Sequence, residues 1–297
     1  MAKQKEFEMT KVKSARTPAQ KFGTGVLAVV INAVLWLFSL SCIFPLVWMF
    51  YSSLKKKREF NADIIGLPHN PSFENYIKVL TNKDYHLGSS MLNSVRTTVL
   101  SVVLILIFGF VIGYILARID FKMNRPLYAI FLMGLLIPVH SLLVPIYVVF
   151  NKVGFANQWY TLIIPYVAFG IPIAVFLIES FIKSVPVELE EAAAIDGCGI
   201  YQMFFKIIFP LIRPAIATVS IFTFISSWNE LMFAVTFINK SQYKTLTVGI
   251  MSMVGAYTTK WGEIGAGLMI ATIPTVIMYL LLSEQVQQSL VAGAVKG

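Results

Sequence analysis

Six long apolar runs are the feature that most limits what this 297-residue chain can fold into. A helix needs about 20 residues to cross the hydrocarbon layer of a membrane, because that layer is roughly 30 Å thick and each residue rises about 1.5 Å. Lipid offers no partner to an unpaired backbone N–H, so each run is predicted to be helical. The runs cover residues 26–50, 92–117, 127–150, 161–182, 211–237 and 264–282.

The composition agrees with this pattern. The chain is 57% hydrophobic and only 13% charged, whereas soluble domains average roughly 25% charged residues. The polar segments between the runs are too short for a separate soluble domain. The sequence therefore predicts an all-α integral membrane protein with six transmembrane helices.

Glycine and proline mark special points within the predicted spans. Pro138 and Pro145 in the third run, like the prolines of the fourth and sixth, predict kinked helices that rely on their neighbours. Gly109 and Gly113 lie one turn apart in the second run. They either form a face where another helix approaches closely, or are a chance pair in a glycine-tolerant membrane helix.

The net charge of +9 raises the question of nucleic acid. No stripe of Lys and Arg with interleaved aromatic residues accompanies it, so nucleic acid is excluded and an anionic lipid surface is the expected partner. Cys42 lies in an apolar run and Cys198 in a polar loop, which predicts neither a disulfide nor a metal site.

The distribution of basic residues only weakly fixes the orientation. A cytoplasmic N-terminus places 13 of the 24 Lys and Arg residues inside and 11 outside or at the outer membrane edge, including the run Lys55-Lys56-Lys57-Arg58. The positive-inside rule gives most weight to the first helix. Six basic residues precede that helix, so both termini are predicted to be cytoplasmic.

The most informative polar segment lies between the fourth and fifth runs, at 183–210. Pro186 and the acidic residues that follow suit the first turn of a helix, and the alanines from Ala192 add helix propensity without bulk. Gly197 then allows the chain to turn. A second short helix, Ile200–Phe209, is suited to lie at the membrane interface. A short helix with a smooth alanine face is shaped to sit in a groove of another protein.

These residues carry a resemblance to a known family. Glu191-Ala192-Ala193, followed after three residues by Gly197 and then by Ile207-Ile208-Phe209-Pro210, resembles the EAA loop of binding-protein-dependent ABC importer permeases. The family usually has Leu where Phe209 stands. The surrounding residues are similar to the carbohydrate branch, specifically its maltose-type subunit. Asn93-Ser94 and Trp228-Asn229-Glu230 extend the resemblance, which covers most of the chain from about residue 68.

The resemblance implies an ABC type I importer transmembrane fold and a role for this loop. Glu191 would contact the surface of a cytoplasmic ATPase subunit, and Ala192 and Ala193 would pack in its groove. Asp196 and Gly197 would set the turn between the two short helices. The alternative is a surface helix that merely caps the bundle.

The resemblance also implies the partners and the setting. The chain would act in a bacterial cytoplasmic membrane with a second homologous permease, two copies of an ATPase subunit and an extracytoplasmic solute-binding protein. No Gly-x-x-x-x-Gly-Lys-[Ser/Thr] phosphate loop is present, so a separate chain must bind ATP and Mg²⁺. The chain itself would be neither an enzyme nor a cofactor-binding protein.

Three polar or amphipathic residues, Trp228, Asn229 and Glu230, lie inside the fifth run. A carboxylate in a bilayer costs at least about 2.5 kcal/mol, so Glu230 should face protein or water. These residues either line a path on which Asn229 and Glu230 bind sugar hydroxyls and Trp228 packs on a sugar ring, or they make structural contacts with a neighbouring helix.

Two other functions compete with an ATP-driven sugar importer. An autonomous secondary transporter or channel for a small polar solute would show a repeated half and buried ion ligands, and a membrane enzyme would show a catalytic motif; neither pattern is present. The expected organisation is a cytoplasmic tail (1–25), the first span (26–50), an extracytoplasmic loop (51–88), a permease core (89–283) containing the coupling loop (183–210), and a cytoplasmic tail (284–297).

Overall fold

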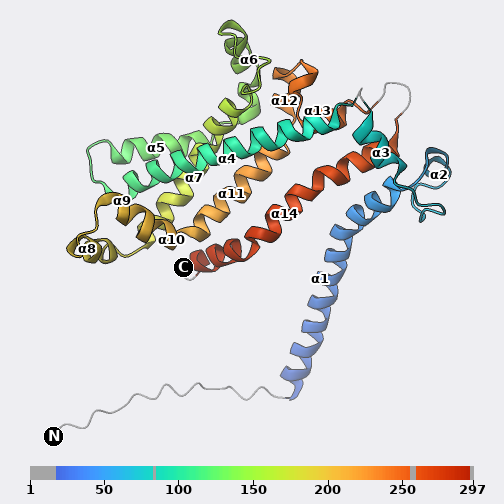
Figure 1. Cartoon of the computed structure of the whole chain (residues 1–297). Helices are drawn as coiled ribbons and strands as arrows, with labels where there is room; N and C mark the ends of the chain where they lie inside the picture. Colours follow the sequence, from blue (N-terminus) through green and yellow to red (C-terminus); the bar gives the residue numbers. More distant parts are fainter. Residues whose placement is uncertain (1–17, 83–84, 255–258, 295–297) are drawn as a thin grey trace.

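The computed structural model describes residues 18–82, 85–254 and 259–294. Within these residues the chain forms helices and turns and no strand (Figure 1). Among the described residues, four helices are long and apolar enough to span a membrane, and the number of candidate spans is six when each of two bent helix pairs counts as one span. The predicted all-α, six-span fold is therefore confirmed. The four long helices are α1 (Pro18–Ser53), α4 (Leu87–Arg118), α7 (Ile163–Ser184) and α14 (Trp261–Ala294).

The third predicted span is broken rather than kinked. Helix α5 (Asn124–Leu135) is followed by a 3-10 turn and then by α6 (Leu143–Lys152), and the two halves are bent by 89°. Pro138 causes the break, because proline has no N–H and disfavours the α conformation at Ile137 before it. Pro145 lies in the first turn of α6, where proline is tolerated.

The fifth predicted span also differs from the expectation. Its central helix α11 (Arg213–Trp228) ends nine residues earlier than predicted, and the chain re-forms a short helix, α12 (Met232–Phe237). Before α11 the chain bends by 73°. The helical stretch before this bend confirms the second short helix expected at Ile200–Phe209 and continues two residues further. It consists of α9 (Ile200–Gln202), the π-helix η2 (Met203–Ile208) and α10 (Phe209–Leu211).

The short helices gather at the two ends of the bundle (Figure 1). Helix α8 (Glu188–Ile195) lies at one end, together with the start of α1 and the close of α14; we call this the α8 end. The opposite end, the α3 end, carries α2 (Lys57–Ala62), α3 (Glu74–Thr81), α12 and α13 (Leu246–Met251). Helix α14 runs to Ala294, so residues 284–294 of the predicted C-terminal tail are helical. Residues 1–17 of the predicted N-terminal tail lie outside the described residues.

Helices α4 and α7 form the most extensive helix–helix contact of the described bundle. A Cβ atom on Gly109 would lie 2.6 Å from the Cβ of Ala174, and one on Gly113 would lie 2.9 Å from Cγ2 of Ile178. Ala174 and Ile178 are fully buried. The two glycines therefore form the predicted face for close helix approach, and α7 occupies it.

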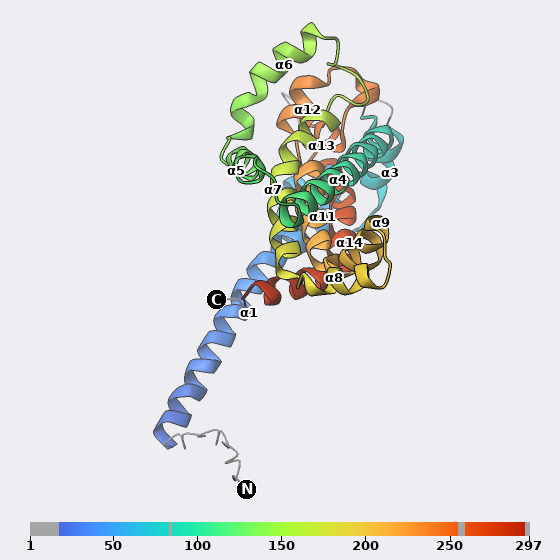
Figure 2. The same ribbon diagram turned by 90° about the vertical axis from the view of Figure 1, so that its left-hand side faces the viewer.

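Helix α1 stands apart from the rest of the bundle. It packs against α14 near the α3 end and then diverges from it (Figures 1 and 2). Its large apolar side chains are exposed, for example Trp36 at 70% and Leu37 at 68%, as expected for a helix that faces lipid or another subunit. Cys42 in this helix and Cys198 are both free thiols, as predicted.

Candidate functional site

Helix α8 is a short, separately held helix at the end of the bundle. Glu188 and Glu191 are exposed in its first turn, where they complement the helix dipole. At its other end Gly197 has φ of +82°, a left-handed conformation that favours glycine. Its N–H donates to the carbonyl of Ala194 at 3.1 Å, and the N–H of Cys198 donates to Ala193 at 2.9 Å. The structure thus places the turn at Asp196 and Gly197.

Glu190 fixes α8 to the end of α4. Its side chain is 9% exposed, and its carboxylate accepts hydrogen bonds from Nε of Arg118 and, at 3.0 Å, from the hydroxyl of Tyr114. Arg118 also donates through Nη2 to the carbonyl of Val185 at 2.8 Å. Charge-assisted bonds of this kind are roughly twice as strong as neutral ones. Sequence reasoning missed this anchor and singled out the adjacent Glu191 instead.

The two alanines predicted to face another protein differ in burial. Ala192 is exposed, but Ala193 is only 7% exposed and packs inside the chain's own fold. The prediction that Ala193 lies in a partner's groove is therefore not supported. Several large apolar side chains of this segment are exposed, as Ala192 is. We call the set the α8 surface: Leu189, Ala192, Ile195, Ile200 and Tyr201, of which Ile195 is 87% and Tyr201 79% exposed.

A second candidate region is a cavity of about 660 Å³ between α4, α7, α11 and α12. This volume lies within the range of small-molecule sites. Aromatic rings and small polar groups share its wall. The ring and polar side chains on it are His140, Tyr166, Phe169, Phe222, Thr223, Ser226, Ser227, Asn229, Glu230 and Phe233.

The three residues predicted to line a substrate path differ in position and contacts. Trp228 is 3% exposed, stacks on Phe224 and donates through Nε1 to the carbonyl of Ala271 at 3.0 Å. It is therefore a packing residue between α11 and α14, and the cavity wall does not include it. Asn229 is exposed and lines the cavity.

Glu230 reaches the cavity wall but is held by structural bonds. Its carboxylate accepts from the backbone N–H groups of Phe233 at 2.7 Å and Ala234 at 3.1 Å, and from the hydroxyl of Tyr166 at 2.8 Å. It thus caps the first turn of α12 and ties it to α7. The geometry of Glu230 therefore favours structural contacts with a neighbouring helix over binding of sugar hydroxyls.

Asn93 and Ser94 also have a structural role. The Asn93 amide donates to the carbonyls of Gln242 and Lys244 at 2.8 and 3.0 Å, and the N–H of Leu246 donates to Oγ of Ser94 at 2.8 Å. The pair therefore holds the loop before α13 against α4. In the described part of the chain, no group of three or more His, Cys, Asp or Glu side chains is placed to hold a metal.

The apolar spans and the cavity between α4, α7, α11 and α12 fit a multi-pass membrane protein. Residues 109–292 match the family described as "Binding-protein-dependent transport system inner membrane component", and the chain belongs to this family. The predicted membership among binding-protein-dependent ABC importer permeases is therefore confirmed.

Among curated proteins, the chain is similar to three sugar permeases over nearly their full lengths. It is 31% identical to the sulfoquinovosyl glycerol transport system permease protein SmoH of Agrobacterium fabrum over 86% of this chain and 89% of that protein. It is 33% identical to the trehalose/maltose transport system permease protein MalG of Thermococcus litoralis, over 90% and 96%. It is 32% identical to the melibiose/raffinose/stachyose import permease protein MelC of Bacillus subtilis, over 96% and 100%.

A solved structure supports the same fold. The chain superimposes with a TM-score of 0.76 on a chain of a bacterial ABC transporter involved in the import of the acidic polysaccharide alginate. The match covers 88% of this chain and 97% of the other, at 22% sequence identity. The predicted ABC type I importer transmembrane fold is thereby confirmed.

Proposed function

We propose that this chain is one permease half of an ATP-driven importer for a sugar or oligosaccharide, and that α8 couples it to a separate ATPase. The observation that carries the proposal is the construction of α8: Leu189, Ala192 and Ile195 form an exposed apolar strip on it, while Glu190 ties its inner side to α4. A helix that is attached to the bundle on one side and exposes an apolar strip on the other is suited to transmit a push from a docked partner.

The orientation follows from this role. The α8 end faces the cytoplasm, where ATP is available, so both termini are cytoplasmic and the α3 end is extracytoplasmic. ATP and Mg²⁺ bind to two copies of the ATPase subunit, and a second permease completes the pathway. Closure of the ATPase pair moves α8, and α4 follows through Arg118, which shifts the bundle between two states. A solute-binding protein delivers the cargo at the α3 end.

The cavity supports a carbohydrate cargo. Aromatic side chains such as Phe169 and Phe222 offer flat apolar faces to the C–H side of a sugar ring, and Asn229 and Ser226 offer hydrogen bonds to hydroxyls. The relatives named for trehalose/maltose and melibiose/raffinose/stachyose favour the same class.

Replacing Ala192 with tryptophan tests the docking of α8. The added ring stands on an exposed position of the α8 surface, so it separates this helix from a docked ATPase without disturbing the fold. We expect ATPase retained on the purified permease to fall about 30-fold, the loss typical of a disrupted interface centre. The control is Ala62→Trp, the same change at an exposed alanine of α2 on the opposite end. Equal retention by both variants, or sugar flux through the purified chain without ATP, would contradict the proposal.

Replacing Asn229 with alanine tests the cavity as the cargo path. The side chain is exposed to the cavity, so its loss should remove one hydrogen bond to cargo and raise the transport KM about 3- to 10-fold. The melting temperature should stay unchanged. Glu230→Ala should behave in the opposite way, lowering the melting temperature because α12 loses its cap. A changed melting temperature with unchanged KM for Asn229→Ala would argue against this path.

A further inference from the structure

The basic residues that the positive-inside rule leaves unexplained gather at one place in the structure. A cytoplasmic N-terminus leaves eleven Lys and Arg residues outside or at the outer membrane edge. Five of them line a single pocket of about 640 Å³ at the α3 end, which we call the outer basic pocket. Those five are Lys56, Lys57, Arg58, Lys78 and Lys260.

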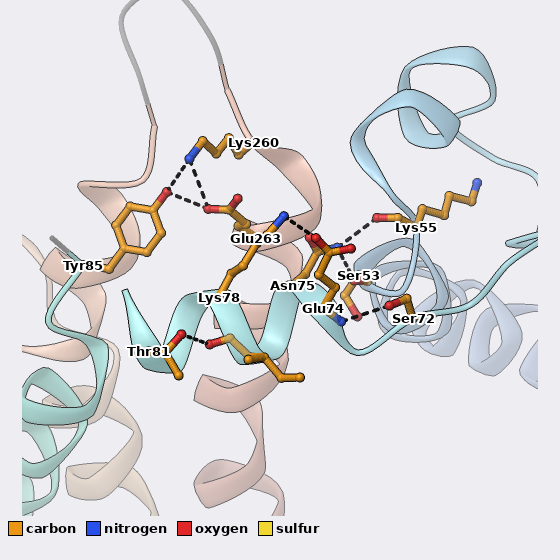
Figure 3. Close-up of polar contacts among 11 residues, drawn as sticks. Ser53, Lys55, Ser72, Glu74, Asn75, Lys78, Thr81, Tyr85, Lys260 and Glu263 are labelled. Atoms are coloured by element: carbon orange, nitrogen blue, oxygen red, sulfur yellow. Dashed lines mark hydrogen bonds and ion pairs between the residues drawn. The ribbon is translucent and has the colours of Figure 1, made fainter. Parts of the chain in front are cut away.

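The walls of the outer basic pocket are well fixed. The Asn75 amide on α3 donates to the carbonyls of Ser53 and Lys55 at 2.7 and 2.9 Å, which ties α3 to the end of α1 (Figure 3). The Tyr85 hydroxyl donates to Oε2 of Glu263 at 2.6 Å and ties the start of α4 to α14. Burial, and then the bond to Glu263, raise the pKa of Tyr85, so this hydroxyl keeps its proton and continues to donate.

The two acidic side chains of the pocket are already paired with two of its cations. Glu74 pairs with Lys78 at 2.7 Å, and Glu263 lies 3.6 Å from Lys260 (Figure 3). The other three cations, Lys56, Lys57 and Arg58, are exposed and make no ion pair within the described residues. The lining therefore has a formal charge of +3 and suits an anion.

Three features beside this pocket are typical of the level of lipid headgroups. The apolar span of α1, Leu27–Ser53, ends just before the pocket residues. A loop beside it exposes Ile64, Ile65 and Leu67, at 53%, 70% and 71%. The side chains of Trp48 and Tyr51 on α1 donate to the carbonyls of Ile64 and Ile65. Trp and Tyr concentrate at the membrane interface, so the apolar loop is suited to rest in that layer.

We propose that the outer basic pocket binds the phosphate headgroup of an anionic lipid from the outer leaflet. Arg58 offers a guanidinium fork to the phosphate oxygens and Lys57 a second charge, while Asn61 and Thr81 on the wall can bind glycerol hydroxyls. The acyl chains would lie along the exposed apolar surface of α1, where it diverges from α14 (Figure 1). The pocket shares no lining residue with the cavity of the proposed cargo path, so the site is peripheral to transport. The assignment of leaflet rests on the orientation proposed above.

The test is lipid retention on the purified, assembled importer. Native mass spectrometry would count bound phosphatidylglycerol after equilibration with phosphatidylglycerol or with phosphatidylcholine. We expect selective retention of phosphatidylglycerol and an affinity about 30-fold weaker in the double variant Lys57→Gln/Arg58→Gln, as two basic contacts near a lipid surface are lost. The matched control is Lys152→Gln/Lys240→Gln, which removes two exposed charges of the same sign outside the pocket and should retain the lipid.

Four results would overturn the proposal. The first is equal retention of the two lipids, and the second is equal loss in the pocket and control variants. The third is unchanged lipid binding in a pocket variant that loses stimulation by the solute-binding protein, because the pocket would then receive an acidic protein surface. Displacement of phosphatidylglycerol by soluble glycerol phosphate at equal concentration would assign the site to a free phosphate compound instead. Labelling Glu191→Cys with an impermeant reagent tests the proposed membrane orientation separately. A wrong orientation can therefore be distinguished from the absence of a lipid site.

Discussion

Glu190→Ala is expected to uncouple ATP hydrolysis from transport. The variant leaves Arg118, whose side chain is 10% exposed, with the carbonyl of Val185 as its remaining hydrogen-bond partner among the described residues. Removing one member of a buried ion pair costs about 3–5 kcal/mol. About 3 kcal/mol corresponds to a change of roughly 100-fold in the population of correctly seated α8. We therefore expect ATP-driven sugar uptake to fall about 100-fold while ATPase activity of the complex persists.

The control for this prediction lies on the same helix. Glu188→Ala makes the same chemical change at an exposed position of the first turn, and uptake should fall less than about twofold, as for most exposed positions. The double variant Glu190→Met/Arg118→Met should recover part of the uptake, because replacing both partners of a buried pair by apolar residues is often neutral. Full uptake by Glu190→Ala would show that α8 needs no attachment to α4.

The comparison of Glu190 with Glu191 shows where sequence reasoning stops. The composition of 183–210 and the position of Gly197 located the helix and its turn, because these depend on local propensity. Which of two adjacent carboxylates turns inward depends on the rotation of α8 against α4. That rotation is set by Arg118, 72 residues away in the sequence, and no local pattern encodes it. The same limit explains why Ala193 proved to be buried.

The transmembrane spans show the same limit: hydropathy predicts where they lie but not how they bend or end. Hydropathy located all six, because lipid exposure demands about 20 apolar residues whatever the tertiary packing. It did not reveal that the third span is bent by 89° at Pro138, because the hydropathy of the run is the same before and after the break. Nor did it reveal that α11 stops at Trp228, where Glu230 caps a new helix. The side chain of Trp228 packs against α14 rather than lining the cavity, because long-range packing decides its direction.

Gly109→Leu is expected to prevent assembly of the α4–α7 pair. Even the first side-chain atom would lie 2.6 Å from Cβ of Ala174, closer than real Cβ contacts. Ala174 is fully buried, so it has no space to move aside. Overpacking by one or two methylenes already costs about 1–3 kcal/mol, and a leucine adds four carbons. We expect folded yield in detergent to drop at least about tenfold, measured by size-exclusion chromatography.

The matched control is Gly88→Leu, the same substitution in the first turn of the same helix, where a Cβ would meet nothing within 4 Å. It should fold normally. The decisive variant is the exchange Gly109→Ala/Ala174→Gly, which moves one methyl group across the contact. Gly109→Ala alone should lower the melting temperature, and the added Ala174→Gly should restore most of it, because the two Cβ atoms no longer compete for one space. If the exchange were no more stable than Gly109→Ala alone, helix propensity rather than close approach would account for the glycine at this position.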